Sequence, residues 1–316
     1  MSSRLQHFPI SFFAMVLGLA GYVIAWQKME ELFNVTPILS VGLVFLVSGV
    51  FIILFSIYLV KIITYPALVK AEFSHPIKSS FFPTISISLL LLATLFLPVA
   101  STVSLWLWWV GASLQLVLTL AVISLWINHS QFEVSHMNPS WFIPAVGNIV
   151  VPVAGVEHGL VEISWFFFSI GIIFWLILLT IFFNRIIFHH PLPNKLLPTL
   201  FILIAPPAIG FISLVKLTGE VGAGERILLY FALFMSFLVF TQWRRFYELE
   251  FYLSWWAYSF PLGALTIANV LMFKMSGYLV FFYISLLCFM VLTTIIMILL
   301  YRTALAVKEQ SICQAE

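Results

Sequence analysis

The sequence predicts an all-α integral membrane protein, built from ten transmembrane helices that pair as five helical hairpins. Its composition is the first indication: of 316 residues, 63% are hydrophobic and only 8% are charged, with a mean hydropathy of +1.13. Soluble domains carry about 25% charged residues. This composition excludes an ordinary soluble enzyme, a nucleic-acid-binding protein and a disordered chain. The apolar stretches are continuous rather than alternating, which favours helices over a β-barrel.

Long apolar runs are the second indication, because a helical span needs about 20 mostly apolar residues. The chain therefore reads as a single transmembrane domain, 1–316. The fifth run is the weakest, since it is short and rich in proline. Ten runs qualify, near 8–27, 38–60, 79–97, 103–127, 139–156, 160–183, 197–217, 226–243, 251–273 and 278–301.

Lysine and arginine predict the orientation, since they are enriched in cytoplasmic loops. With both termini placed inside, ten basic residues fall inside and four outside. The outside set is Lys28, Lys216, Arg226 and Lys274. The inside set is Arg4, Lys61, Lys70, Lys78, Arg185, Lys195, Arg244, Arg245, Arg302 and Lys308. We expect cytoplasmic N- and C-termini, and the short tails favour a bacterial inner membrane.

Proline distribution is the third indication, because the even runs have none in their interiors. The odd runs contain Pro9, Pro83, Pro139, Pro144, Pro152, Pro198, Pro206, Pro207 and Pro261. An interior proline frees a carbonyl and kinks the helix, which a bilayer tolerates only against protein or a watery cavity. This pattern predicts that the odd helices form an inner ring with pseudo-fivefold symmetry around a central pore. The alternative is a packed bundle without a path.

The predicted span interiors have essentially no ionisable side chain. Their polar groups are neutral, for example Ser86, Gln115 and Asn148, and each of them more often makes an interhelical hydrogen bond than lines a pore. A neutral path favours passive conduction of easily dehydrated anions over proton coupling. The histidines fall in loops or at span ends, and no catalytic motif is present. We expect no enzyme activity, no cofactor, no metal and no nucleic-acid partner.

Several motifs on the odd runs are similar to one known family. Span 1 carries Leu17-Gly18-Leu19-Ala20, and span 7 carries Ala205-Pro206-Pro207. Around span 5 are Asn138-Pro139-Ser140 and Pro144-Ala145-Val146-Gly147-Asn148. Span 9 has the most specific stretch, Trp255-Trp256-Ala257-Tyr258-Ser259-Phe260-Pro261. Together they resemble the TehA-type bacterial homologues of the plant slow anion channels, in the tellurite-resistance/dicarboxylate transporter family.

The resemblance implies ten helices in five hairpins, and a homotrimer in which each subunit has its own pore. It also implies that Phe260, on the ninth helix, blocks that pore. Further candidates for kinks and pore lining are Gly18, Pro144, Gly147, Asn148, Pro206, Pro207, Pro261 and Gly263. The expected function is a gated channel for small monovalent anions. The alternative is a secondary transporter of dicarboxylates or tellurite oxyanions.

Overall fold

The structure is a computed structural model that describes residues 4–128 and 132–313. Within these ranges the regular structure is entirely helical. Nine described helical segments are long and apolar enough to cross a membrane. They are Ile10–Phe33, Ile38–Thr64, Lys78–Phe96, Ser101–Asn128, Val161–Phe188, Asn194–Thr218, Ala223–Phe240, Leu253–Ser276 and Leu279–Lys308. Each coincides with one of the predicted runs, within a few residues at most ends.

The fifth predicted run, 139–156, differs from a continuous span. It is the shorter apolar segment Pro139–Gly155, which is divided into alternating 3₁₀ and α pieces. The α pieces are α6 (Phe142–Val146) and α7 (Val151–Gly155), with 3₁₀ turns at Pro139–Trp141 and Gly147–Val150. Three prolines explain the breaks, since each lacks the N–H that a continuous helix requires.

Burial separates the long segments into two groups that alternate along the chain. The first group is 67–78% buried and contains α1 (Phe13–Phe33), α4 (Thr84–Phe96), α9 (Ala205–Thr218) and α12 (Ser259–Ser276). The second group is 28–39% buried and contains α2 (Ile38–Thr64), α5 (Ser101–Asn128), α8 (Val161–Phe188), α10 (Ala223–Phe240) and α13 (Leu279–Lys308). The exposed side chains of the second group are mainly apolar, as lipid-facing surfaces require.

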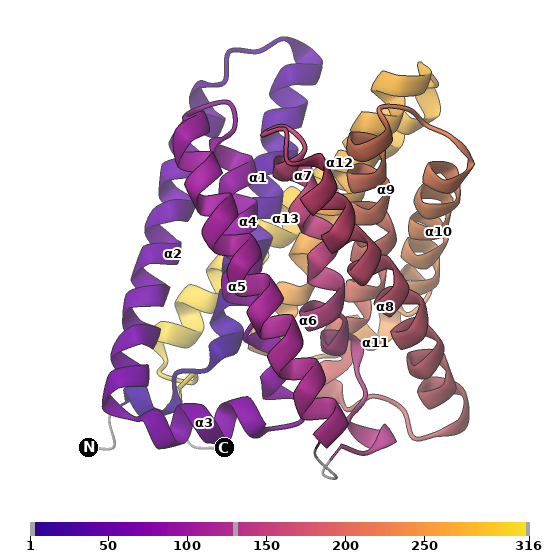
Figure 1. Ribbon diagram of the computed structural model, residues 1–316. Helices are drawn as coiled ribbons and strands as arrows, with labels where there is room; N and C mark the ends of the chain where they lie inside the picture. Colours follow the sequence, from indigo (N-terminus) through magenta and orange to yellow (C-terminus); the bar gives the residue numbers. More distant parts are fainter. Residues whose placement is uncertain (1–3, 129–131, 314–316) are drawn as a thin grey trace.

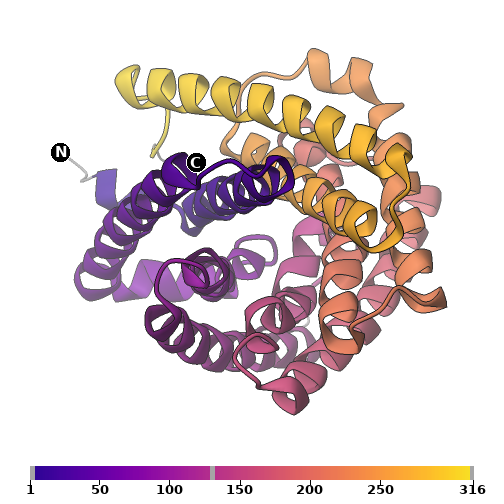
Figure 2. The same ribbon diagram turned by 90° about the horizontal axis from the view of Figure 1, so that it is seen from above.

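The buried elements contact one another in a closed cycle. Helix α1 packs on α4, α4 contacts α7, α7 contacts α9, α9 contacts α12, and α12 returns to α1. The exposed helices lie around this cycle (Figure 2), each next to the buried element that precedes it in sequence. The inner position predicted for the proline-containing runs is therefore the position that these segments occupy.

The prolines act differently from the expectation that they kink helix interiors. Each buried span has a 3₁₀ segment before its α-helical part, for example Asn194–Ile204 before α9 and Leu253–Tyr258 before α12. Pro206, Pro207 and Pro261 lie in the first turns of these two helices. A first-turn N–H has no intrahelical acceptor, so proline is tolerated there without losing a hydrogen bond. These prolines start α-helices after a 3₁₀ turn.

Hydroxyl side chains satisfy carbonyls at these transitions. Ser86 Oγ donates to Pro83 O at 2.8 Å, and Ser259 Oγ donates to Trp256 O at 2.6 Å. Thr84 Oγ1 donates to Phe81 O in the same manner. Unpaired backbone groups are expensive in a bilayer, so these local bonds stabilise a backbone that departs from regular helix. The neutral polar residues thus serve mainly as hydrogen-bonding groups within the bundle.

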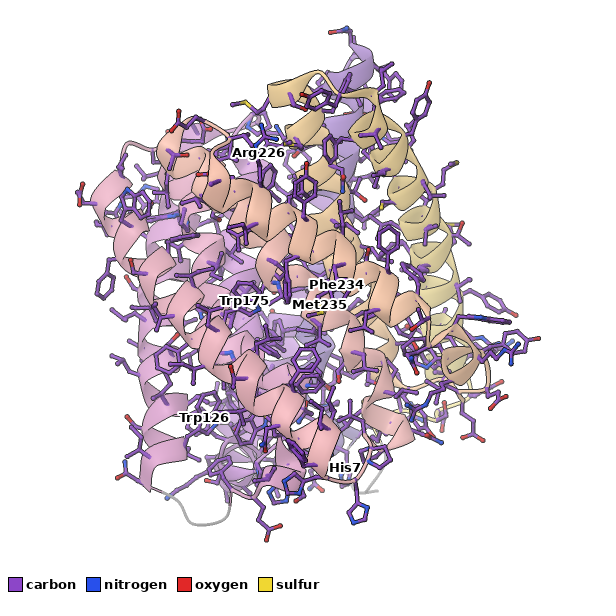
Figure 3. The ribbon with its side chains drawn as sticks, turned by 90° about the vertical axis from the view of Figure 1, so that its right-hand side faces the viewer. His7, Trp126, Trp175, Arg226, Phe234 and Met235 are labelled. Carbon is purple, nitrogen blue, oxygen red and sulfur yellow. The ribbon has the colours of Figure 1, made fainter. Side chains whose placement is uncertain are left out.

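The first and last described residues lie at the same end of the bundle, beside the short helix α3 (Pro66–Ser74) (Figure 1). Figure 3 shows the two ends of the bundle from another side: Arg226, in the first turns of α10, lies near one end of the bundle, and His7 lies near the other. Trp175, Phe234 and Met235 lie between them. Another short helix, α11 (Trp243–Tyr247), follows α10.

Candidate functional site

A cavity of about 90 Å³ lies inside the ring of buried elements. All five inner spans contribute to its wall, at the level where their 3₁₀ segments become α-helix. Its lining consists of Ala14, Leu17, Phe81, Thr84, Ile87, Phe142, Ile143, Val146, Gly147, Ile149, Val150, Ile202, Ala205, Pro206, Ile209, Trp256, Ala257, Phe260 and Pro261. One water needs about 10–15 Å³ of such space, so the cavity has room for several water-sized particles.

The wall of this cavity is neutral and mostly apolar. Among its lining residues none carries a formal charge, and the hydroxyl of Thr84 is directed to Phe81 O. The indole N–H of Trp256 donates to Thr303 Oγ1 on α13 at 3.0 Å, so it is already satisfied outside the cavity. An ion inside would therefore meet aromatic and aliphatic surface. In channels, hydrophobic constrictions stop ions by excluding water.

Phe260 is half-buried and borders this cavity immediately before Pro261. Its other neighbour is Gly21 on α1. A methyl group placed on Gly21 would lie 3.2 Å from Cδ2 of Phe260, which shows how closely the ring approaches the α1 backbone. Gly21 has no role in the sequence motifs above. The sequence analysis missed this contact; the signal for it is the spacing of two small residues, Gly18 and Gly21, three positions apart on one helix.

The predicted site residues divide into two sets. Four of them border the cavity, namely Gly147, Pro206, Phe260 and Pro261. The other five lie outside its lining, namely Gly18, Pro144, Asn148, Pro207 and Gly263. Pro207 is buried in the first turn of α9. The remaining four have packing or hydrogen-bonding positions.

Gly18 and Gly263 allow α1 and α12 to approach closely. A Cβ on Gly18 would lie 2.0 Å from Ser259 Oγ and 2.9 Å from Ser259 Cβ. A Cβ on Gly263 would lie 3.0 Å from the backbone carbonyl of Gly21. Small residues at facing positions are a common way for membrane helices to pack. These glycines therefore set the helix separation that brings Phe260 against Gly21.

Pro144 and Asn148 belong to a polar cluster that holds the broken fifth segment. The carbonyl of Pro144 accepts from Gln115 Nε2 at 3.0 Å and from Thr119 Oγ1 at 2.8 Å, both on α5. Asn148 Nδ2 donates to Thr119 Oγ1 at 3.0 Å and to Ala145 O at 2.6 Å. Side chains of the exposed helix thus satisfy the carbonyl of Pro144, close to the point where α6 gives way to the 3₁₀ turn Gly147–Val150.

One buried ion pair lies at the end of a predicted span. Lys61, in the last turn of α2, is 3% exposed and forms a 2.7 Å ion pair with Glu72 of α3. Glu72 also accepts from Tyr58 Oη and from the backbone N–H of Ile10, while Lys61 donates to Phe8 O. This network ties the start of the first inner span to α3. His129, one of the predicted loop histidines, lies outside the described residues.

A larger apolar groove of about 620 Å³ lies elsewhere, between α1, α2 and α13. Its wall includes Ile38 and Leu39, which are 80% and 51% exposed. Only one of the five inner spans contributes to it. We assign this groove to the lipid-facing side of the bundle and not to a path through it.

Comparison with known proteins agrees with the resemblance in the motifs. The plant S-type anion channel SLAH3 of Arabidopsis thaliana is 30% identical over 273 residues, covering 84% of this chain and 43% of the plant protein. An uncharacterized transporter of Methanocaldococcus jannaschii is 27% identical over 309 residues, covering 90% of each protein. A tellurite resistance protein TehA homolog of Haemophilus influenzae is 28% identical over 264 residues, covering 81% of this chain and 79% of the homolog.

The chain thus spans less than half of the plant channel and nearly all of the archaeal transporter. The SLAC1 family, described as voltage-dependent anion channel, matches residues 7–304. This match contains all five inner spans and the cavity between them. The chain belongs to the SLAC1 family, as a TehA-type relative of the plant anion channels.

Proposed function

We propose that this chain forms a gated anion channel, in which small monovalent anions cross the membrane passively and the ring of Phe260 closes the path. The observation that carries this proposal is the central cavity, because all five inner spans line it and its wall is neutral. Phe260 supplies a bulky apolar group at a point where the path is already narrow. Membership of an anion channel family supplies the sign of the ion.

The full architecture belongs to the same proposal. Ten crossings in five hairpins, with pseudo-fivefold symmetry, require Pro139–Gly155 to act as the tenth span. Its place in the closed cycle of contacts supports this role. The shared end of the two termini supports it as well, because an even number of crossings returns the chain to its starting side (Figure 1). Both termini are cytoplasmic, in a bacterial inner membrane, and three subunits assemble with one path each.

Ion preference follows from the neutral wall. A path without a basic ring offers little compensation for lost hydration, so anions that dehydrate easily pass best. The expected order places iodide and nitrate above chloride. A reversal potential that follows the cation gradient would contradict anion conduction.

Phe260→Ala tests the gate directly. We expect large anion currents from the reconstituted variant, because removing the ring widens the path and admits water. Phe273→Ala is the matched control, since Phe273 is on the same helix but outside the cavity lining. The control should conduct no more than the unaltered protein. A silent Phe260→Ala protein that reaches the membrane would show that the gate is elsewhere.

The alternative function is a secondary transporter of dicarboxylates or tellurite oxyanions, which the name of the Haemophilus influenzae relative keeps open. Single-channel recording separates the two functions. A carrier that changes conformation for every substrate works at about 1–10³ cycles per second, as enzymes do. Unitary currents far above that rate require an open path, whereas their absence in every variant favours the carrier.

A further inference from the structure

The apolar groove between α1, α2 and α13 contains one buried acid. Glu30, in the last turn of α1, borders the groove and is only 7% exposed. Helices α2 and α13 contact α1 from outside the ring (Figure 2), so this acid belongs to the lipid-facing side of the bundle and not to the central cavity. Ionisable side chains within transmembrane segments are rare and mark binding sites or ion pathways.

One oxygen of Glu30 is held by the protein. Its Oε1 accepts from the indole N–H of Trp26 at 3.1 Å and from the backbone N–H of Ser40 at 3.2 Å. The Trp26 ring packs in turn on Phe289 of α13, with the ring centroids 5.2 Å apart. These contacts join all three helices of the groove and hold the carboxyl group in a defined place.

The other oxygen of Glu30, Oε2, has no hydrogen-bond partner among the described residues. The lysines around the end of α1 are paired elsewhere: Lys28 and Lys274 lie 2.9 Å and 2.7 Å from the carboxylate of Glu31. Protonation of Glu30 would only replace an unpaired acceptor with an unpaired donor. A buried polar atom without a partner is costly in a bilayer, so Oε2 is the atom that a ligand in the groove can satisfy.

The groove matches an amphiphile in size and polarity. Its volume is about 620 Å³, within the range of about 300–1,000 Å³ that is typical of ligand sites. Leu39, Leu43 and Leu46 form its apolar wall on α2, over about 10 Å of the helix axis. Glu30 and Thr36, two polar side chains of the lining, flank the short connection from α1 to α2. A polar end followed by an apolar length is what a phospholipid requires.

Hydrogen-bonding chemistry selects the head group of that lipid. An ionised carboxylate can only accept, so its partner must bring an N–H or O–H donor, and a cationic donor makes the stronger bond. A primary ammonium meets both requirements, whereas a choline head has no N–H and a glycerol head has no positive charge. The terminal torsion of a glutamate is soft, so a small rotation of the carboxyl group directs Oε2 of Glu30 to such a donor.

We propose that this groove is a binding site for a phospholipid with a primary-amine head group, phosphatidylethanolamine, whose ammonium binds Oε2 of Glu30 and whose acyl chain lies along α2. The proposal does not depend on the channel function, because Glu30 lies outside the lining of the central cavity. The bound lipid contacts α1, α2 and α13 together, and therefore stabilises their packing.

The test measures lipid binding to delipidated protein in detergent by native mass spectrometry, with dioleoyl phosphatidylethanolamine, phosphatidylcholine or phosphatidylglycerol as the probe. We expect one phosphatidylethanolamine per subunit, bound about tenfold more tightly than either other lipid, as a hydrogen bond to a charged group allows. Glu30→Gln should remove this preference, because the carboxamide keeps one acceptor oxygen but places a donor where Oε2 was. Glu31→Gln is the matched control, since that side chain is 54% exposed and outside the groove lining, and it should keep the preference.

A second pair of variants tests the groove itself. Gly42 lines the groove, and nothing lies within 4 Å of a Cβ added to it. Gly42→Phe should therefore fill the groove without disturbing the fold, and abolish the binding of one phosphatidylethanolamine per subunit. Gly49 also has nothing within 4 Å of an added Cβ, but it lies outside the groove lining. Gly49→Phe should bind the lipid as the unaltered protein does.

Three results would overturn the lipid site. Equal binding of phosphatidylethanolamine and phosphatidylcholine by the unaltered protein would show that Glu30 recognises no head group. An unchanged preference in Glu30→Gln would place the recognition elsewhere. Loss of subunit association in Gly42→Phe, with no lipid bound to the unaltered protein, would show that the groove is a contact between copies of the chain. The currents of Phe260→Ala do not enter this test, so the lipid site and the channel function can fail separately.

Discussion

Gly21 on α1 and Phe260 on α12 are in such close contact that a single methyl group on Gly21 would lie 3.2 Å from the phenylalanine ring. The α1 backbone therefore supports one side of the ring, while the other side borders the central cavity. Glycine is required here for space, because Gly21 lies within a regular helix. The position of the proposed gate depends on the separation of two inner helices.

Gly21→Ala should destabilise the protein by about 1–3 kcal/mol, since it forces the Phe260 ring to move in a packed interface. In a Phe260→Ala background the same change should cost less than about 1 kcal/mol, because the opposing ring is gone. Unfolding in detergent of the four members of this cycle measures the coupling. Equal costs in the two backgrounds would show that the ring and Gly21 do not interact.

Gly18→Ala should destabilise the protein more than Gly21→Ala does, by about 3 kcal/mol. Its methyl group would clash with both Oγ and Cβ of Ser259, and no rotamer of Ser259 moves its Cβ away. Ser259→Gly in the same chain should recover most of the loss. Gly42→Ala is the matched control: nothing lies within 4 Å of its added Cβ, so the gain in helix propensity should stabilise by about 0.5–1 kcal/mol. Equal effects at Gly18 and Gly42 would contradict the packing.

Glu72→Leu should destabilise by about 3–5 kcal/mol, because it leaves the buried Lys61 ammonium without its carboxylate. The double variant Lys61→Met with Glu72→Leu should lose much less, since no unpaired charge remains. The comparison is with Lys216→Gln, which breaks a pair that is 33% and 45% exposed and should cost less than about 1 kcal/mol. Thermal unfolding in detergent separates these outcomes.

Cys313 tests the orientation of the chain. A membrane-impermeant maleimide should label it only from the cytoplasmic side in a Cys288→Ser background, and Glu220→Cys only from the other side. Burial raises the pKa of the Cys313 thiol above its usual value, so less thiolate is present at neutral pH. Labelling should be slow at pH 7 and should accelerate as the pH rises, because the thiolate fraction grows until the pH exceeds the raised pKa of the thiol. Labelling of both cysteines from one side would refute the proposed topology.

Much of the helical framework follows from the sequence. The nine long segments match predicted runs, because a bilayer requires continuous apolar length whatever the packing. The alternation of buried and exposed helices follows from proline, as predicted, although Pro206 and Pro261 begin α-helices and do not interrupt them. The fifth run shows the limit of this reasoning: the carbonyl of Pro144 near its break accepts hydrogen bonds from Gln115 and Thr119 of another helix, which the local sequence does not indicate.

The sequence by itself determined that the chain is an integral membrane protein and which family it belongs to, because hydropathy and short motifs are local properties of the chain. The predicted pore residues remain predictions, although four of them border the cavity. Only the tertiary structure decided that Gly18 and Gly263 serve helix contact, that Gly21 supports Phe260, and that Glu31 is shared by lysines of two helices. Each of these relationships joins residues far apart in sequence. Their distances depend on how the helices pack, which no local pattern encodes.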